Sequence, residues 1–167
     1  VSAIAPDGLP TYYTCYDRGC NVSAPGGEYF KRNGSTLESG CVLSTFLNNK
    51  YFYSQGTSMA CPHVSGIAAL AISYAADNGI VLTLPELKDI IVSSVNTFEE
   101  HKTTDKKVNY GDPGGGYLNL SSYNNKMGTG YIDAYRVLMA VRGTVCIPLP
   151  VGEQVIIDIN NYIGDGK

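Results

Sequence analysis

The sequence contains no run of basic residues and no unbroken apolar stretch of the length that crosses a bilayer, about 18 residues. Lys and Arg number 12 and Asp and Glu number 15, which gives a formal net charge of -3 at pH 7. Nucleic acids and anionic membranes attract proteins through clustered basic residues. We therefore predict no nucleic-acid partner and no membrane partner. The 167 residues, of which 44% are hydrophobic, are enough to form one buried core.

Paired Cys-x-x-Cys motifs, typical of structural zinc sites, are also absent, so the sequence predicts no metal site and identifies no cofactor. Cys15 and Cys20 are spaced to close a small loop if the protein is exported. Cys61 lies in an apolar run and is expected to be a buried thiol. Because the cysteines number five, at least one is unpaired or pairs outside this chain; the others are Cys41 and Cys146.

The most distinctive segment present is residues 55–70, which read QGTSMACPHVSGIAAL. Gly56 permits a sharp turn, after which Thr57 and Ser58 lie at the start of an apolar helix expected over residues 58–76. The first N–H groups of a helix lack intrahelical partners, so an oxyanion formed at Ser58 would be stabilised there. Taken alone, a serine at this place is most often an N-cap, and the apolar helix is expected to lie in the core.

Residues 55–70 resemble the nucleophile segment of the subtilisin-like serine proteases, Gly-Thr-Ser-Met-Ala-x-Pro-His-Val. Three further segments resemble that family in the same order: residues 21–27, 41–46 and 128–137. The resemblance implies an α/β fold, the C-terminal part of a three-layer α/β/α domain with a mostly parallel sheet. We assign residues 1–143 to this domain and residues 144–167 to a β-rich tail that could begin a following domain.

By the same resemblance, Ser58 would be the nucleophile of a serine endopeptidase that hydrolyses peptide bonds through an acyl-enzyme. The Ser58 amide and Thr57 would support the oxyanion, and Gly56, Met59 and Gln55 would border the bound protein or peptide substrate. For Met59, a place in the core is an equally good interpretation. The family also implies a secreted or cell-envelope location and frequent calcium sites, although no calcium site can be assigned in this sequence.

The catalytic partners of Ser58 are missing from the sequence. Subtilisin-like enzymes carry their triad in the order Asp, His, Ser, yet only Asp7 and Asp17 precede Ser58, and no histidine does. Both aspartates lie in turn-rich sequence and are expected to be surface or turn residues. His63 lies five positions beyond Ser58 on the same helix, which turns it away from the nucleophile, and His101 lies in a charged, solvated stretch.

We therefore expect an incomplete catalytic domain that lacks its Asp and His and is inactive alone. Half a parallel sheet would expose an apolar edge and one face, so the chain is expected to bind the missing N-terminal half of the domain or to self-associate. The alternative is a non-catalytic homologue, or half-domain, with a binding or structural role.

The remaining pattern predicts the secondary structure around this segment. Thr83 and Glu86 have capping-box spacing and begin a second helix, with Leu84, Leu87, Ile90, Ile91 and Val95 on its apolar face. A last helix begins near Asp133. Residues 96–127 read as a long insertion that is mobile or disordered. Strands are expected at residues 1–5, 21–24 and 41–46, with a loop at 6–20 and a loop or hairpin at 26–40.

Overall fold

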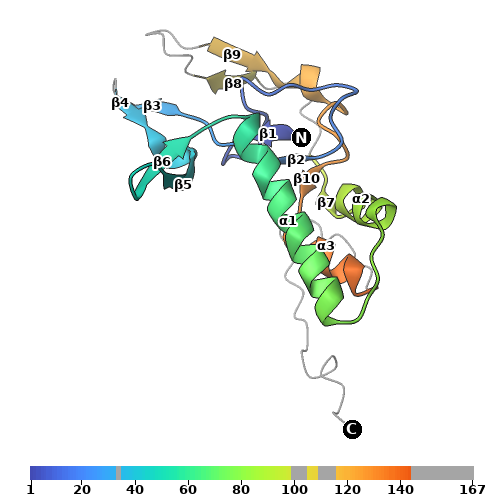
Figure 1. Ribbon diagram of the computed structural model, residues 1–167. Helices are drawn as coiled ribbons and strands as arrows, with labels where there is room; N and C mark the ends of the chain where they lie inside the picture. The colour runs from blue at the N-terminus through green and yellow to red at the C-terminus, as the bar shows by residue number, and fades with distance from the viewer. Residues whose placement is uncertain (33–34, 99–104, 109–115, 144–167) are drawn as a thin grey trace, which may run out of the picture.

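The computed structural model describes residues 1–32, 35–98, 105–108 and 116–143, and the predicted tail at 144–167 lies outside this range (Figure 1). A four-stranded sheet has the order β1-β2-β10-β7. β1 pairs with β2 and β2 with β10 in parallel, while β7 pairs with β10 in antiparallel. This confirms the predicted α/β class with a mostly parallel sheet. The four strands are Ser2–Ile4 (β1), Ser23–Pro25 (β2), Val95–Asn96 (β7) and Tyr131–Ile132 (β10).

Three helices pack together over one face of the sheet: α1 (Thr57–Asp77), α2 (Leu84–Ser93) and α3 (Ala134–Val141) (Figure 1). Ala3 of β1 and Ala24 of β2 face α1, whose buried residues are all alanines. Small side chains on both elements let the helix backbone approach the strands closely. The predicted last helix is confirmed, and the Asp133 side chain caps it by accepting the Arg136 N–H at 3.0 Å.

The opposite face of the sheet is covered by the hairpin of β8 (Asp105–Val108) and β9 (Gly116–Asn119) and by the 3-10 turn η2 (Leu120–Tyr123). Ile4 packs into this second apolar cluster, whereas the preceding Ala3 packs into the first, as alternation along a strand requires. The expectation that residues 96–127 are mobile is therefore wrong for their described parts. Residues 99–104 and 109–115 lie outside them.

Two further hairpins lie between β2 and α1. Of the loop or hairpin predicted at 26–40 the structure has the hairpin, and it confirms the strand predicted at 41–46. The strands of the two hairpins are β3 (Phe30–Arg32), β4 (Ser35–Leu37), β5 (Val42–Phe46) and β6 (Lys50–Ser54), with the 3-10 turn η1 (Glu38–Gly40) between β4 and β5. Asn48 and Asn49 have φ values of 59° and 56° in the turn between β5 and β6, a conformation that asparagine tolerates. Most apolar side chains of this hairpin are exposed, among them Leu43, Phe46, Tyr51 and Phe52.

The prediction that α1 lies in the core is wrong for much of its surface. Ala60, Ala71 and Ala75 are its buried residues, while Leu70 is 47% exposed and Ile72 is 53% exposed. One side of α1 covers the sheet, and no described element packs on the other side. By length and composition alone α1 also passes for a membrane-spanning helix, which corrects our statement that no such stretch exists. A central helix of an α/β domain has the same composition.

We expected an exposed sheet edge, but the outer edge of β1 is covered. The Ala3 N–H donates to the Thr14 hydroxyl at 2.7 Å, and the Ala3 carbonyl accepts the Thr11 N–H at 3.3 Å. These are the two backbone groups of Ala3 that point away from β2. Because residues from the following loop satisfy them, the apolar surface left open is the outer side of α1 rather than a sheet edge.

The capping box of α2 is confirmed: the Thr83 hydroxyl accepts the Glu86 N–H, and the Glu86 carboxylate accepts the Thr83 N–H at 2.8 Å. Leu87, Ile90 and Ile91 contribute to the core as predicted. Leu84, however, is 79% exposed, because the first residue of the helix faces away from the sheet. Val95 lies beyond α2, in β7.

Candidate active site

Ser58 is the second residue of α1, and its side chain is exposed. The chain reaches it from β6 through Gln55 and Gly56 (Figure 1). Gly56 has a φ of 149°, in a region that side chains other than glycine rarely adopt. The predicted turn ahead of the helix is thus present, and it needs the glycine.

The first backbone amides of α1 divide into two pairs. The Met59 and Ala60 N–H groups both donate to the Gly56 carbonyl, at 2.9 and 3.2 Å. The Thr57 and Ser58 N–H groups find no backbone acceptor in the part of the chain that the structure describes, and the Ser58 hydroxyl makes no hydrogen bond there. These groups are therefore open to a ligand carrying negative charge at the positive end of the helix.

Gln55, predicted to border the substrate, has both ends of its amide engaged within the protein. Its Oε1 accepts the Tyr29 N–H at 2.8 Å, and its Nε2 donates to the Tyr12 hydroxyl at 2.6 Å. Thr57 and Met59 are half-buried. A Cβ added to Gly56 would lie 3.6 Å from the Met59 sulfur, so Met59 packs close to the turn.

His63 is bonded to its own helix, since Nδ1 lies 2.7 Å from the Met59 carbonyl oxygen. This contact holds the His63 ring against its own helix. The preceding Pro62 stands in the second turn of α1 and cannot donate to the Ser58 carbonyl. His101 lies outside the described residues.

Asp7 and Asp17 are turn residues, as predicted. The Asp7 carboxylate accepts the Leu9 N–H at 3.0 Å, and the Asp17 carboxylate accepts the Arg18 N–H at 2.9 Å. Neither contacts Ser58 or His63. Within the described ranges, no Asp–His–Ser constellation is formed.

A buried ion cluster, which the sequence did not predict, joins β8 to Asp7 and Glu28. The Lys106 ammonium of β8 is 2.6 Å from the Glu28 carboxylate and 3.2 Å from that of Asp7, and it donates to the Pro10 carbonyl. The Lys106 and Glu28 side chains are 5% and 3% exposed. The Glu28 carboxylate also accepts the Tyr12 N–H at 3.0 Å. No pattern in the sequence Asp105, Lys106, Lys107, Val108 indicates that Lys106 faces inward, because three charged residues follow one another there.

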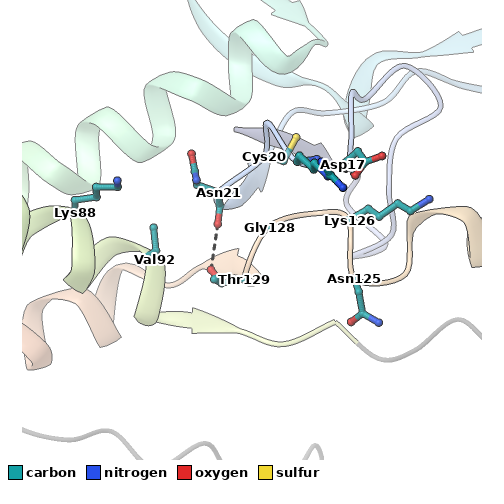
Figure 2. A pocket seen from close by; sticks show the side chains of 10 residues that line it. Asp17, Cys20, Asn21, Lys88, Val92, Asn125, Lys126, Gly128 and Thr129 are labelled. Carbon is teal, nitrogen blue, oxygen red and sulfur yellow. Dashed lines mark hydrogen bonds between the residues drawn. The ribbon is translucent and has the colours of Figure 1, made fainter.

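Figure 2 shows a separate pocket of about 380 Å³ between the loop at 17–21, α2 and the loop at 125–129. The Thr129 hydroxyl donates to the Asn21 carbonyl across it. None of the predicted site residues lines this pocket. The lining residues are Asp17, Arg18, Cys20, Asn21, Lys88, Val92, Asn125, Lys126, Gly128 and Thr129.

The thiols of Cys15, Cys20, Cys41 and Cys61 are unpaired in the structure, and Cys146 lies outside the described residues. Cys61 is exposed rather than buried as predicted, because it faces away from the sheet on α1. Burial, together with the nearby Glu38 and Glu28 carboxylates, raises the pKa of the Cys41 thiol, which disfavours the reactive thiolate. The described residues contain no group of three or more His, Cys, Asp or Glu side chains placed to hold a metal ion.

Comparison with known proteins gives consistent matches. The profile of the subtilase family matches residues 1–127. The chain is 38% identical over 98 residues to the extracellular basic protease of Dichelobacter nodosus, covering 59% of this chain and 15% of that protein. It is 30% identical over 116 residues to pyrolysin of Pyrococcus furiosus, covering 67% of this chain and 7% of that protein.

Solved structures share the fold. The prenylagaramide maturation protease PagA superposes with a TM-score of 0.60 at 18% identity, covering 86% of this chain and 42% of that one. A lanthipeptide protease gives a TM-score of 0.59 at 21% identity, covering 83% of this chain and 41% of that one. The chain thus spans less than half of these structures and a smaller share of the two relatives above.

Proposed function

The chain belongs to the subtilase family, and on this basis we propose that it is the nucleophile-bearing part of a serine endopeptidase. The Ser58 hydroxyl attacks a peptide carbonyl. The amine of the cleaved bond departs, and the acyl group stays bonded to the Ser58 oxygen until water hydrolyses this acyl-enzyme. The observation that carries the proposal is the exposed Ser58 at the start of α1, beside amides without an acceptor among the described residues.

Each predicted site residue has a role in this proposal. The Ser58 N–H donates to the oxyanion of the tetrahedral intermediate, and Thr57 supports the same charge. Gly56 leaves room for the substrate backbone, because it has no Cβ. Met59 and the backbone of Gln55 border the bound peptide, while the Gln55 side chain holds the turn.

We propose that the base and its orienting carboxylate come from another segment, because no described histidine or aspartate contacts Ser58. A histidine there would take the Ser58 proton and return it to the leaving amine. The chain alone is then inactive, since a serine hydroxyl without a base is a weak nucleophile. The exposed side of α1 is the surface that the rest of such a domain, or a second copy of this chain, would cover.

The substrate is a protein or peptide, and the location is secreted or in the cell envelope, in keeping with the relative from Dichelobacter nodosus that is named an extracellular protease. The alternative is a non-catalytic homologue that uses the exposed apolar surfaces of α1 and the β5–β6 hairpin for binding.

Peptide hydrolysis separates the two functions. We expect no turnover from the 167-residue chain, and turnover after fusion to the Asp- and His-bearing N-terminal part of a related subtilase domain. Ser58→Ala should abolish that activity. Ser65→Ala, on the same helix, should keep it, because the Ser65 hydroxyl only bonds the Cys61 carbonyl. A folded fusion without turnover would support the binding role, and turnover by the chain alone would contradict the missing base.

A further inference from the structure

The turn ahead of Ser58 is held on one side by the Gln55 side chain, whose amide bonds Tyr29 and Tyr12. Its central residue, Gly56, has no side chain and is fixed through its backbone. The Gly56 N–H is shared between two acceptors, the Gly26 carbonyl and the Tyr13 hydroxyl, each at 3.0 Å. The Gly56 carbonyl accepts the Met59 and Ala60 N–H groups of α1. A shift of the Gly56 peptide therefore moves the start of the helix that carries Ser58.

Tyr13 joins this turn to the segment after β2. Its O–H donates to the Gly27 carbonyl while its oxygen accepts the Gly56 N–H, so one hydroxyl bridges two loops that are distant in the sequence. The ring packs edge-on against Tyr12, with centroids 5.2 Å apart and planes at 86°. Burial raises the pKa of Tyr13 to about 12, so the hydroxyl keeps its proton, and with it both bonds, through neutral and moderately alkaline pH.

Two neighbouring contacts hold Tyr13 in place. A Cβ on Gly26 would lie 2.9 Å from the Tyr13 oxygen, so the hydroxyl sits directly against that backbone. The adjacent Tyr12 is fixed at its N–H by the buried Glu28 carboxylate and at its hydroxyl by the Gln55 amide. The hydroxyls of both Tyr12 and Tyr13 thus reach the turn, and the Glu28 carboxylate fixes the backbone that precedes Tyr13.

We propose that Tyr13 is a positioning residue for the nucleophile: its hydroxyl fixes the Gly56 peptide and thereby the place of Ser58 and of the Ser58 N–H. The inference rests on the proposed function for its catalytic consequence, while the placement of Gly56 can be tested in the chain itself. Tyr13 bonds Gly27 and Gly56 rather than Ser58, so it acts through Gly56.

The first test is hydrogen exchange of the Gly56 amide in the 167-residue chain, measured by NMR. Tyr13→Phe keeps the ring and removes both bonds of the hydroxyl, so exchange at Gly56 should become about tenfold faster, in line with the loss of one or two hydrogen bonds. Tyr51→Phe, on the exposed hairpin, should leave it unchanged. Equal exchange in wild type and Tyr13→Phe would overturn the proposal.

If the Tyr13→Phe protein does not fold, NMR of the wild-type chain still tests the proposal. A slowly exchanging Tyr13 hydroxyl proton with a nuclear Overhauser effect to the Gly56 N–H is expected, and its absence overturns the proposal. In the active fusion, Tyr13→Phe should lower kcat about tenfold with KM nearly unchanged, whereas a rise in KM alone contradicts positioning. If the wild-type fusion has no activity, the proposed function fails, while the Gly56 exchange still tests the role of Tyr13.

Discussion

Gly26 lies where β1, Tyr13 and the turn before α1 meet. A Cβ at this position would be 2.5 Å from the Ala3 Cβ, closer than packed atoms allow, and 3.0 Å from the Gly56 oxygen, tighter than most packed contacts. Single residues therefore decide whether the turn before Ser58 can form. Gly56 itself contributes a backbone angle and the hydrogen bonds of its N–H and carbonyl groups rather than a side-chain contact.

Gly26→Ala should lower the free energy of unfolding by about 1–3 kcal/mol, the usual cost of overpacking a filled site. The measurement is urea unfolding of the chain. Gly66→Ala is the matched control: nothing lies within 4 Å of its added Cβ on α1, and alanine should stabilise the helix by about 1 kcal/mol. A Gly26→Ala protein as stable as wild type would show that the space around Gly26 is not filled.

Among the elements, α2 begins at a capping box of Thr83 and Glu86, which can be recognised from the sequence alone. Hydrogen bonds from the Thr83 hydroxyl and then the Thr83 backbone lower the pKa of Glu86. Because the folded-state pKa lies below the unfolded one, the cap stabilises α2 at pH values above the unfolded pKa, about 4.3. The stabilisation is lost as the pH falls through the folded pKa.

We predict that Glu86→Gln removes this part of the acid sensitivity. The difference in unfolding free energy between wild type and Glu86→Gln should shrink as the pH is lowered from about 6 to about 3, measured by urea unfolding at each pH. Thr83→Ala should reduce the same pH dependence, since it removes the strongest of the hydrogen bonds that lower the pKa. A Thr83→Ala protein with the full acid response would contradict the assignment.

The β8–β9 hairpin is anchored by contacts of Lys106 that the sequence does not predict. Lys106 meets the Pro10 carbonyl 96 residues away in the sequence, and no local pattern pairs it with Glu28. Lys106→Met leaves the Glu28 carboxylate buried without its cation, which should cost about 3–5 kcal/mol in unfolding free energy.

The control for the ion cluster is Lys107→Met, since Lys107 is exposed beside it on β8. Calorimetry or urea unfolding should find this control close to wild type. The double variant Glu28→Gln/Lys106→Met should recover part of the loss, because the uncharged amide that replaces the Glu28 carboxylate leaves no buried charge. Equal losses in the single and double variants would refute the account of the cluster.

For the whole molecule, the sequence predicted those features that depend on neighbouring residues. The turn at Gly56, the start of α2 at Thr83 and the start of α3 near Asp133 all follow from local chemistry. Three features depend on contacts between segments that are distant in the sequence, so the sequence could not predict them. They are the closed edge of β1, the second core under the β8–β9 hairpin and the Tyr13 bridge. The burial of α1 was overestimated because an apolar composition does not say which faces are covered.

The uncovered side of α1 makes self-association the expected behaviour of the chain alone. Leu70→Lys and Ile72→Lys together should lower the mass measured by light scattering, with only a small change in unfolding free energy for exposed positions, about 0.5 kcal/mol or less each. Ala71→Lys, between them but fully buried, should prevent folding. A wild-type chain that stays monomeric at high concentration would contradict this prediction.

The central claim, that Ser58 is the nucleophile, is tested most directly by the site of covalent labelling. The active fusion is treated with a fluorophosphonate and the modified peptide is identified by mass spectrometry. We predict a single adduct on Ser58 that disappears in Ser58→Ala and remains in Ser65→Ala. An adduct on another residue, or labelling that survives Ser58→Ala, would contradict the account.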